Sequence, residues 1–142
     1  MDTIFAVDDG SEPIGFTACG AESRDYNVSE IVLFERVLTN YGGYYSSQAS
    51  SFMCPIDGVY VFTLAINVVE TNIGVCINRN GVELTTTWVD GAPHNHATNA
   101  VVTECLTGDV IWPRIKFISG DNNIYSEINC FTSFSGVLIK HL

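Results

Sequence analysis

The segment from Val59 to Val69, VYVFTLAINVV, constrains the fold more than any other part of the chain. Alternate residues of a strand point to opposite faces, so the segment divides into two sets. The sets are Tyr60, Phe62, Leu64, Ile66 and Val68 on one face, and Val59, Val61, Thr63, Ala65 and Asn67 on the other. Both sets are mostly apolar, whereas a strand with a solvated face alternates with polar residues. The segment therefore predicts a strand in a sandwich whose outer face also meets another subunit.

The remainder of the chain also favours strands. Val and Ile total 28 residues and Thr 12, against 7 Leu and 2 Lys, and β-branched residues suit strands better than helices. Asn80-Gly81 predicts a tight hairpin, because both residues tolerate the positive φ of a type I′ turn. Turn-forming residues recur at short intervals, in segments 40–43, 55–58, 78–81, 90–93, 107–109 and 120–123. We expect an all-β sandwich or jelly roll with almost no helix.

Length and charge narrow the class of protein. A chain of 142 residues suits one domain, in which residues 1–13 form a loose tail and residues 14–142 the globular part. The net charge of -10 disfavours nucleic acid and anionic membranes as partners. No stretch approaches the roughly 18 apolar residues of a membrane span, and the acidic start does not match a secretory signal. A cytosolic protein and a mature chain without its leader both fit.

The five cysteines are widely spaced and show no CxxC pair of a zinc or redox site. They are Cys19, Cys54, Cys76, Cys105 and Cys130. Cys76 and Cys105 stand among apolar, strand-like neighbours. We expect most of the five to be small buried hydrophobic residues, because free cysteine is commonly buried.

The aromatic and glycine positions carry a resemblance to a known family. Five residues separate Phe34 from Asn40. At further fixed intervals along the chain come Tyr45, Phe52, Gly58, Tyr60 and Phe62. This spacing resembles the globular head of the complement C1q family, in the superfamily that includes tumour necrosis factor. Leu64 replaces an aromatic residue usual in the pattern. The segments IGFTACG, SSFMCPIDGVYVF, LTGDVIW and FTSFSGVLI extend the similarity over about residues 14 to 139.

The resemblance implies a ten-stranded jelly roll that assembles as a compact homotrimer, here without the collagen-like stalk. The matching positions suit a structural core: Phe34, Phe52, Tyr60, Phe62 and Phe134. Gly58 fits a turn with positive φ, and Gly136 fits a bulge or a close backbone approach. We expect these residues to form the scaffold and not the site.

Residues 85–100, TTTWVDGAPHNHATNA, read as a long polar loop, and loops on a β scaffold commonly bind ligands. Its candidate ligand-binding residues are Trp88, Asp90, His94, Asn95 and His96. The histidines suit a transition metal, whereas the oxygens of Asp90 and Asn95 suit calcium. Calcium-binding members of the family hold their ligands in the corresponding loop, where only Asp90 matches. A solvated loop is the first expectation for this segment, and a calcium site at Asp90 and Asn95 is the hypothesis held beside it.

Aromatic residues near turns are candidates for stacking on sugars. Trp88 and Tyr125 are the better candidates for exposure, whereas Tyr44 and Tyr45 adjoin the family pattern and suit core or interface packing. Asp121 and Asn123 belong to a second polar loop that is either a ligand-binding loop or simply a turn.

The resemblance implies a secreted, homotrimeric recognition protein with lectin-like binding of glycans or microbial surface polysaccharides in innate immunity. Three copies of a weak site would gain affinity through avidity. A cytokine-like or synaptic-organiser-like ligand of a protein receptor is the alternative, followed by an acidic, calcium-binding matrix protein. No nucleophile motif such as GxSxG or HExxH occurs, so we expect no enzyme activity.

Overall fold

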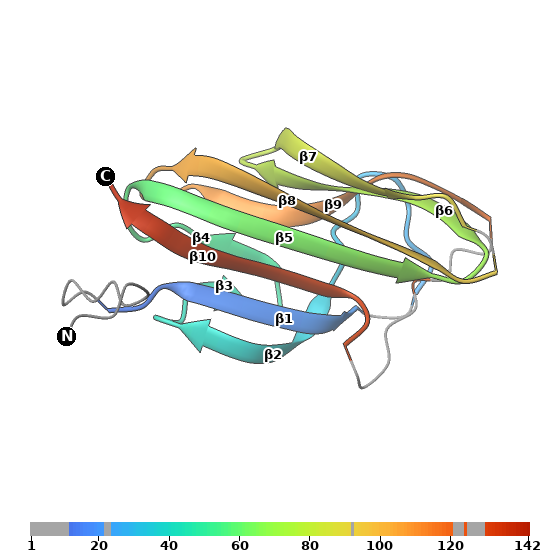
Figure 1. Ribbon diagram of the computed structural model, residues 1–142, viewed down its shortest axis with the longest axis horizontal. Helices are drawn as coiled ribbons and strands as arrows, with labels where there is room; N and C mark the ends of the chain where they lie inside the picture. The colour runs from blue at the N-terminus through green and yellow to red at the C-terminus, as the bar shows by residue number, and fades with distance from the viewer. Residues whose placement is uncertain (1–11, 22–23, 92, 121–123, 125–129) are drawn as a thin grey trace, which may run out of the picture.

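The computed structural model describes residues 12–21, 24–91, 93–120, 124 and 130–142. Two five-stranded antiparallel sheets pack face to face (Figure 1). Sheet A has the order β2-β1-β10-β5-β8, and sheet B has the order β3-β4-β9-β6-β7. The strands are β1 (Gly15–Ala21), β2 (Phe34–Tyr41), β3 (Tyr45–Ser46), β4 (Ser51–Met53), β5 (Gly58–Val68), β6 (Thr71–Arg79), β7 (Val82–Val89), β8 (Asn95–Cys105), β9 (Val110–Gly120) and β10 (Ser133–His141).

The prediction of an all-β, ten-stranded jelly roll is confirmed. Consecutive strands often lie in different sheets, so each sheet is assembled from distant parts of the chain. The described residues form no helix. Among them there is accordingly no helical segment that could cross a membrane.

Strand β5 has the alternation that its sequence predicts. Its residues alternate between fully buried and half-buried along the whole strand, from Gly58 to Val68. It lies between β10 and β8, so hydrogen bonds hold both of its edges. The buried set faces sheet B, and the half-buried set forms part of the outer face of sheet A.

Aromatic rings fill the space between the sheets. Phe16 stacks on Tyr45 with ring centroids 4.6 Å apart and meets Phe134 edge-on at 4.9 Å. The core residues predicted from the sequence, which are all buried, are Phe34, Phe52, Tyr60, Phe62 and Phe134. The Tyr45 hydroxyl donates to the carbonyl of Phe34 at 2.8 Å, and burial raises the pKa of Tyr45 to about 12. Tyr45 is therefore a core residue, whereas Tyr44 is exposed.

Two glycines of the family pattern make room for neighbours. The prediction of positive φ at Gly58 is wrong, because this residue lies in extended backbone. A Cβ there would lie 2.5 Å from Leu138 Cδ1 and 2.8 Å from the carbonyl oxygen of Lys140. At Gly136 a Cβ would lie 2.5 Å from the Phe62 ring, so the close neighbour is an aromatic side chain and not the backbone that we expected. Both positions require glycine for space and not for turn geometry.

The prediction of a long loop over residues 85–100 is wrong. Residues 85–89 belong to β7 and residues 95–100 to β8, which leaves a short connection between the two sheets. Both are edge strands, and an edge strand meets solvent on more sides than a central one. Thr and Asn side chains are tolerated there, so the sequence resembles a loop. The predicted hairpin at Asn80-Gly81 is confirmed, with φ of 54° and 92°.

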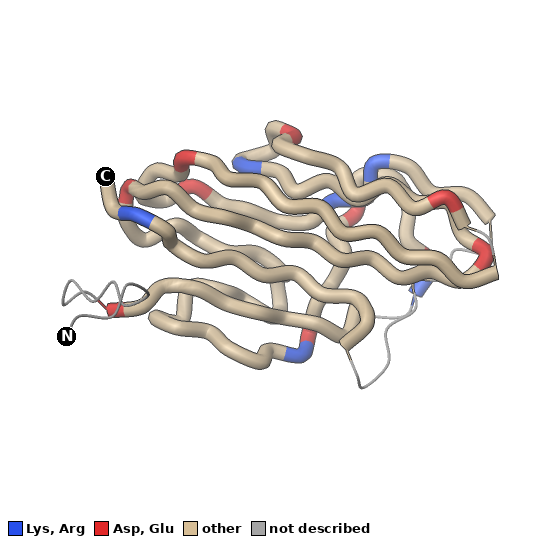
Figure 2. Tube along the Cα trace, viewed as in Figure 1, with Lys and Arg blue, Asp and Glu red and all other residues tan. Residues whose placement is uncertain are grey.

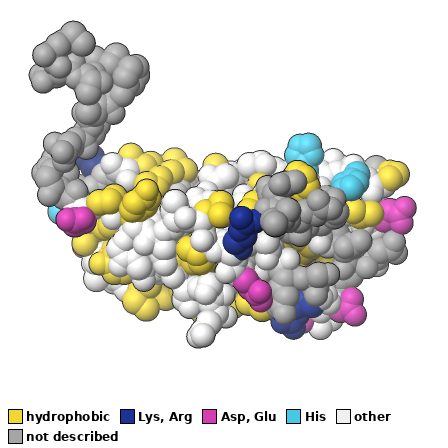
Figure 3. Space-filling view, turned by 90° about the horizontal axis from the view of Figure 1, so that it is seen from below, with side chains coloured by type: hydrophobic (Ala, Val, Ile, Leu, Met, Phe, Trp, Pro, Cys, Tyr) yellow, Lys and Arg dark blue, Asp and Glu magenta, His cyan; other side chains and the backbone are white. Residues whose placement is uncertain are grey.

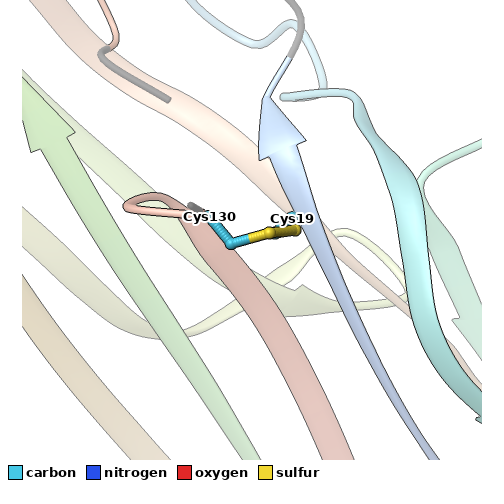
Figure 4. Close-up of a disulfide and its surroundings, with 2 residues drawn as sticks. All are labelled: Cys19 and Cys130. Carbon is cyan, nitrogen blue, oxygen red and sulfur yellow. A yellow bond between two sulfur atoms is a disulfide. The ribbon is translucent and has the colours of Figure 1, made fainter. Parts of the chain in front are cut away.

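Cys19 and Cys130 form a disulfide between β1 and the segment that leads into β10 (Figure 4). The other three cysteines are Cys54, Cys76 and Cys105, which are free and buried. The expectation that most cysteines are buried and unbridged is therefore confirmed. The disulfide links β1 to the segment just before β10. These strands are the first and last along the chain, and they also pair with each other in sheet A.

Candidate functional site

A β-bulge places an aromatic ring on the outer face of sheet B. Val75 of β6 pairs with Ile115 of β9, but Gly74 pairs with Phe117, so Lys116 is an extra residue. One extra residue moves the following side chains to the opposite face of a sheet. Ile115 accordingly packs in the core, whereas Phe117 faces outward with 38% of its surface exposed.

Trp88, Gly74 and Phe117 form a row across β7, β6 and β9, here called the aromatic row. The Trp88 and Phe117 rings meet edge-on, with centroids 6.3 Å apart. A Cβ on Gly74 would lie 2.3 Å from Phe117 Cε1, so the glycine leaves the ring its place. Trp88 is 62% exposed. The aromatic row therefore presents a compact apolar surface to solvent.

An ion pair spans β6 beside the aromatic row. Lys116 Nζ donates to both carboxylate oxygens of Glu83 at 2.9 Å. The hydroxyl of Thr86 donates to the same carboxylate. These two contacts, Thr86 first, hold the pKa of Glu83 below its ordinary value. The result is a polar, charged margin to an apolar patch, a combination that can orient a ligand bearing hydroxyl groups.

The connection from Asp90 to His94 is held firmly at the same end of the sandwich. The backbone N–H of Gly91 donates to Asn72 Oδ1 at 2.7 Å. Asn95 Nδ2 donates to the carbonyl of Asp90 at 2.7 Å. A Cβ on Gly91 would lie 2.2 Å from the carbonyl oxygen of Thr71, so the connection is pressed against the start of β6. The strand end that carries Trp88 is thereby fixed.

The outer face of sheet A has a different character. Its central residues are uncharged and include Val61, Thr63, Val102, Ser135 and Val137. The charged positions of the front sheet lie toward its ends in Figure 2, and its middle carries none. Figure 3, the view from below, shows an edge of the sandwich instead, where Lys, Arg, Asp and Glu side chains lie on the described surface beside hydrophobic ones. The middle of the broad outer face of sheet A therefore carries no charged group that could anchor a small ligand.

The sequence model of the C1q domain matches residues 15–139 of the chain. The chain belongs to the C1q domain family. A similar protein is human complement C1q and tumor necrosis factor-related protein 9A, 29% identical over 109 residues that cover 76% of this chain and 33% of that protein. Caprin-2 of Danio rerio is 30% identical over 112 residues, which cover 76% of this chain and 12% of that protein. The chain thus spans about a third or less of these two relatives.

Solved structures share the fold of this C1q domain. The globular domain of zebrafish complement 1qA protein superposes with a TM-score of 0.75 at 17% identity, covering 91% of this chain and 99% of that one. Murine APRIL, crystallised at pH 5.0, superposes with a TM-score of 0.70 at 14% identity, covering 90% of this chain and 100% of that one. Both structures show that the two-sheet fold is shared at low sequence identity.

The C1q domain separates the predicted site residues. Trp88 is exposed as expected, but it lies on a strand of sheet B. His96 pairs with Asn67 on the outer face of sheet A, so Trp88 and His96 face opposite sides of the sandwich. Asp90 and His94 lie exposed in the connection between them. The predicted residues Asp121, Asn123 and Tyr125 lie outside the described residues.

Sequence reasoning did not identify Phe117 as a site residue of this C1q domain. It stands in the apolar run WPRIKFIS, where ordinary alternation from Ile115 places it in the core. The position of the bulge decides which face of sheet B Phe117 occupies. In the sequence, only Gly74 on the neighbouring strand indicated that a large side chain packs against that strand. A glycine within an otherwise apolar strand is the one sequence signal that was available.

The described residues fit a calcium ion poorly. Asn95 Oδ1 already accepts a hydrogen bond from the backbone N–H of His96 at 2.9 Å, so this side-chain oxygen is engaged by the protein itself. That leaves the Asp90 carboxylate, whereas calcium takes six to eight oxygen ligands. Across the part of the chain that the structure describes, no group of three His, Cys, Asp or Glu side chains is placed to hold a metal. Calcium binding remains a prediction.

Proposed function

We propose that the chain is an extracellular, homotrimeric recognition domain that binds glycans of microbial or cell surfaces through the aromatic row. The observation that supports glycan binding is the exposed Trp88–Phe117 pair beside the Glu83–Lys116 ion pair. An aromatic face packs against the apolar face of a sugar ring, and neighbouring polar groups bond to its hydroxyls. Trp88 supplies the exposed ring, and Glu83 and Lys116 supply acceptors and donors.

The outer face of sheet A supports the trimer. Its middle combines valine and small polar residues without charge, and obligate interfaces are depleted of charged residues in the same way. Because this face is used between subunits, the outer face of sheet B would point away from the assembly. The aromatic row would then be displayed three times, and weak individual contacts would combine through avidity.

A cytokine-like ligand of a protein receptor is the second candidate function. The human relative is named for complement C1q and tumor necrosis factor, and murine APRIL shares the fold. A receptor would contact a larger surface than one aromatic row, because specific protein interfaces bury about 800 Å² on each partner. Binding of this kind would be insensitive to free sugars.

The test is an array of glycans and bacterial polysaccharides, run on purified trimer with calcium and again with a chelator. Trp88→Ala is expected to weaken binding to any positive glycan about tenfold, equivalent to about 1.4 kcal/mol per site. Val82→Ala is the matched control, because Val82 is 64% exposed on the same strand but lies away from the aromatic row.

The outcomes separate the candidates. A specific glycan signal that Trp88→Ala removes and Val82→Ala retains supports the proposal. Equal binding by the wild type and Trp88→Ala would show that glycans bind elsewhere than at the aromatic row. A blank array with folded trimer, together with sugar-insensitive capture of one membrane receptor, would favour the cytokine-like function. Sensitivity to the chelator would show whether Asp90 takes part through calcium.

A further inference from the structure

Cys54 and Cys105 lie side by side at the far end of the sandwich from the aromatic row. Cys105 is the last residue of β8, and its pairing partner is Gly58 at the start of β5. Cys54 directly follows β4 of sheet B. The Cys54 thiol interacts with the Cys105 thiol closely enough for each to shift the pKa of the other, and both residues are buried within the same core. Two thiols from opposite sheets are therefore neighbours.

Backbone hydrogen bonds hold this thiol pair in place. The N–H of Cys54 donates to the carbonyl of Asp109 at 2.8 Å, and the N–H of Gly108 donates to the carbonyl of Cys54 at 2.8 Å. Cys54 is thus fastened to the turn that directly follows Cys105. Within that turn the N–H of Leu106 donates to the Asp109 carboxylate at 2.9 Å. The backbone segments that carry the two thiols are therefore held close together by the local fold.

The surroundings make the two thiols unequal. The hydrogen bond from Cys54 lowers the pKa of Cys105, and the nearby Arg79 guanidinium lowers it further, while burial opposes both. The hydrogen bond to Cys105, together with burial, raises the pKa of Cys54. Arg79 is itself fixed by a hydrogen bond to the Thr103 hydroxyl at 2.9 Å. Cys105 is therefore the thiol that ionises first and reacts as the nucleophile.

We propose that Cys54 and Cys105 are a redox-active pair that closes to a second disulfide when the protein meets hydrogen peroxide. The Cys105 thiolate attacks one peroxide oxygen, the O–O bond breaks, and hydroxide leaves, so that Cys105 becomes a sulfenic acid. The sulfur of Cys54 then attacks the Cys105 sulfur, and the S–O bond breaks. The hydroxyl group leaves as water with the thiol proton. Overall, two thiols and one peroxide give one disulfide and two waters.

Peroxide is an oxidant small enough for this site. It is close to water in size, and the turn that covers the pair is solvent-exposed at Leu106, Thr107 and Gly108. The new bond would join the end of β4 in sheet B to the end of β8 in sheet A. Cys76 provides an internal comparison, because it lies on the outer side of β6 and not in the core that holds Cys54 and Cys105.

The experiment starts from folded protein with the Cys19–Cys130 disulfide intact. The protein is treated with hydrogen peroxide, the excess is removed with catalase, and remaining thiols are alkylated with a maleimide in denaturant. Intact mass and peptide mapping then count and locate the modified cysteines. Untreated protein is expected to take up three maleimides, at Cys54, Cys76 and Cys105, and treated protein one, at Cys76. A reductant should restore the three.

The same assay separates a cross-link from other oxidation. The proposed disulfide lowers the mass by about 2 Da, whereas a sulfinic acid raises it by about 32 Da and resists reductants. C76S is the matched control and should still form the cross-link. C105S should leave Cys54 free to react with maleimide, and mapping of the wild type decides the question if that variant does not fold. Three reactive thiols after treatment, or overoxidation without a linked Cys54–Cys105 peptide, would overturn the proposal.

Discussion

The two outer faces of the sandwich both expose apolar side chains, but they distribute them differently. Sheet A presents a broad, uncharged surface of valine and small residues such as Val61 and Val137, with charges only toward its ends. Sheet B concentrates its apolar area in Trp88 and Phe117, next to an ion pair. A broad, charge-poor face suits a second copy of the chain, whereas a compact aromatic patch with a polar margin suits a small ligand. In the proposed function, sheet A would serve assembly and sheet B recognition.

The largest effect is expected from a charge in the middle of sheet A. Val137→Glu would place an unpaired carboxylate in the proposed subunit interface, and an uncompensated buried charge costs about 3 to 5 kcal/mol. We expect light scattering to show a single chain of 15.5 kDa where the wild type has three times that mass.

Val82→Glu is the matched change on sheet B. Val82 is 64% exposed in the isolated chain and Val137 is 47% exposed, so neither substitution disturbs the core. Val82→Glu should leave the trimer intact. If both variants remained trimers, the subunit interface would not lie on the outer face of sheet A, and the two faces would not differ in their role in assembly.

A smaller effect is expected from Gly74→Ala. The added methyl would lie 2.3 Å from the Phe117 ring, which must turn away, whereas the backbone at Gly74 accepts alanine because its φ is not positive. We expect the affinity for a glycan ligand to fall about threefold to tenfold, within the roughly 0.5 to 1.5 kcal/mol of an aromatic pair contact. The trimer should persist. Unchanged affinity would show that Trp88 binds without Phe117.

The smallest effect is expected from the ion pair. Exposed ion pairs contribute about 0 to 1 kcal/mol, so Lys116→Met should lower the free energy of unfolding at pH 7 by less than about 1 kcal/mol. Because the pKa of Glu83 is lowered in the fold, its contribution is present above the ordinary value of 4.5 and disappears as the pH falls below it.

Denaturant unfolding at several pH values measures this contribution of the Glu83–Lys116 ion pair to the free energy of unfolding. The difference between the wild type and Lys116→Met should shrink toward zero as the pH falls through the lowered pKa of Glu83, which lies below 4.5, because Glu83 is then protonated in both proteins. Glu83→Gln should behave like Lys116→Met at neutral pH. A difference that stays constant with pH would mean that the lysine stem contributes by packing and not by charge.

The core was predictable because it depends on local rules. The alternation in residues 60–68 determines which side chains face sheet B, and the spacing of Phe34, Phe52 and Phe134 places them in the same layer. The hairpin at Asn80-Gly81 follows from backbone preference alone. Exposure of Trp88 was also predictable, because an amphipathic aromatic residue stood among polar neighbours.

The outer faces were less predictable because they depend on register and on edges. The bulge between Gly74 and Val75 reverses the face of Phe117, and nothing within β9 itself marks where pairing shifts. The edge positions of β7 and β8 allow Thr and Asn to occupy strands, which made residues 85–100 look like a loop. The proximity of Cys54 and Cys105, 51 positions apart in the sequence, arises only from the packing of two sheets.

The Cys19–Cys130 bond closes a covalent ring around most of the domain, because its two ends are separated by 111 positions. A protease that cut one exposed tip inside the ring, such as the turn at Asn80 and Gly81, would leave both fragments joined. Such a nicked molecule would run as one band on a non-reducing gel and as two after reduction. The ring therefore allows the domain to survive a single cleavage as one connected molecule.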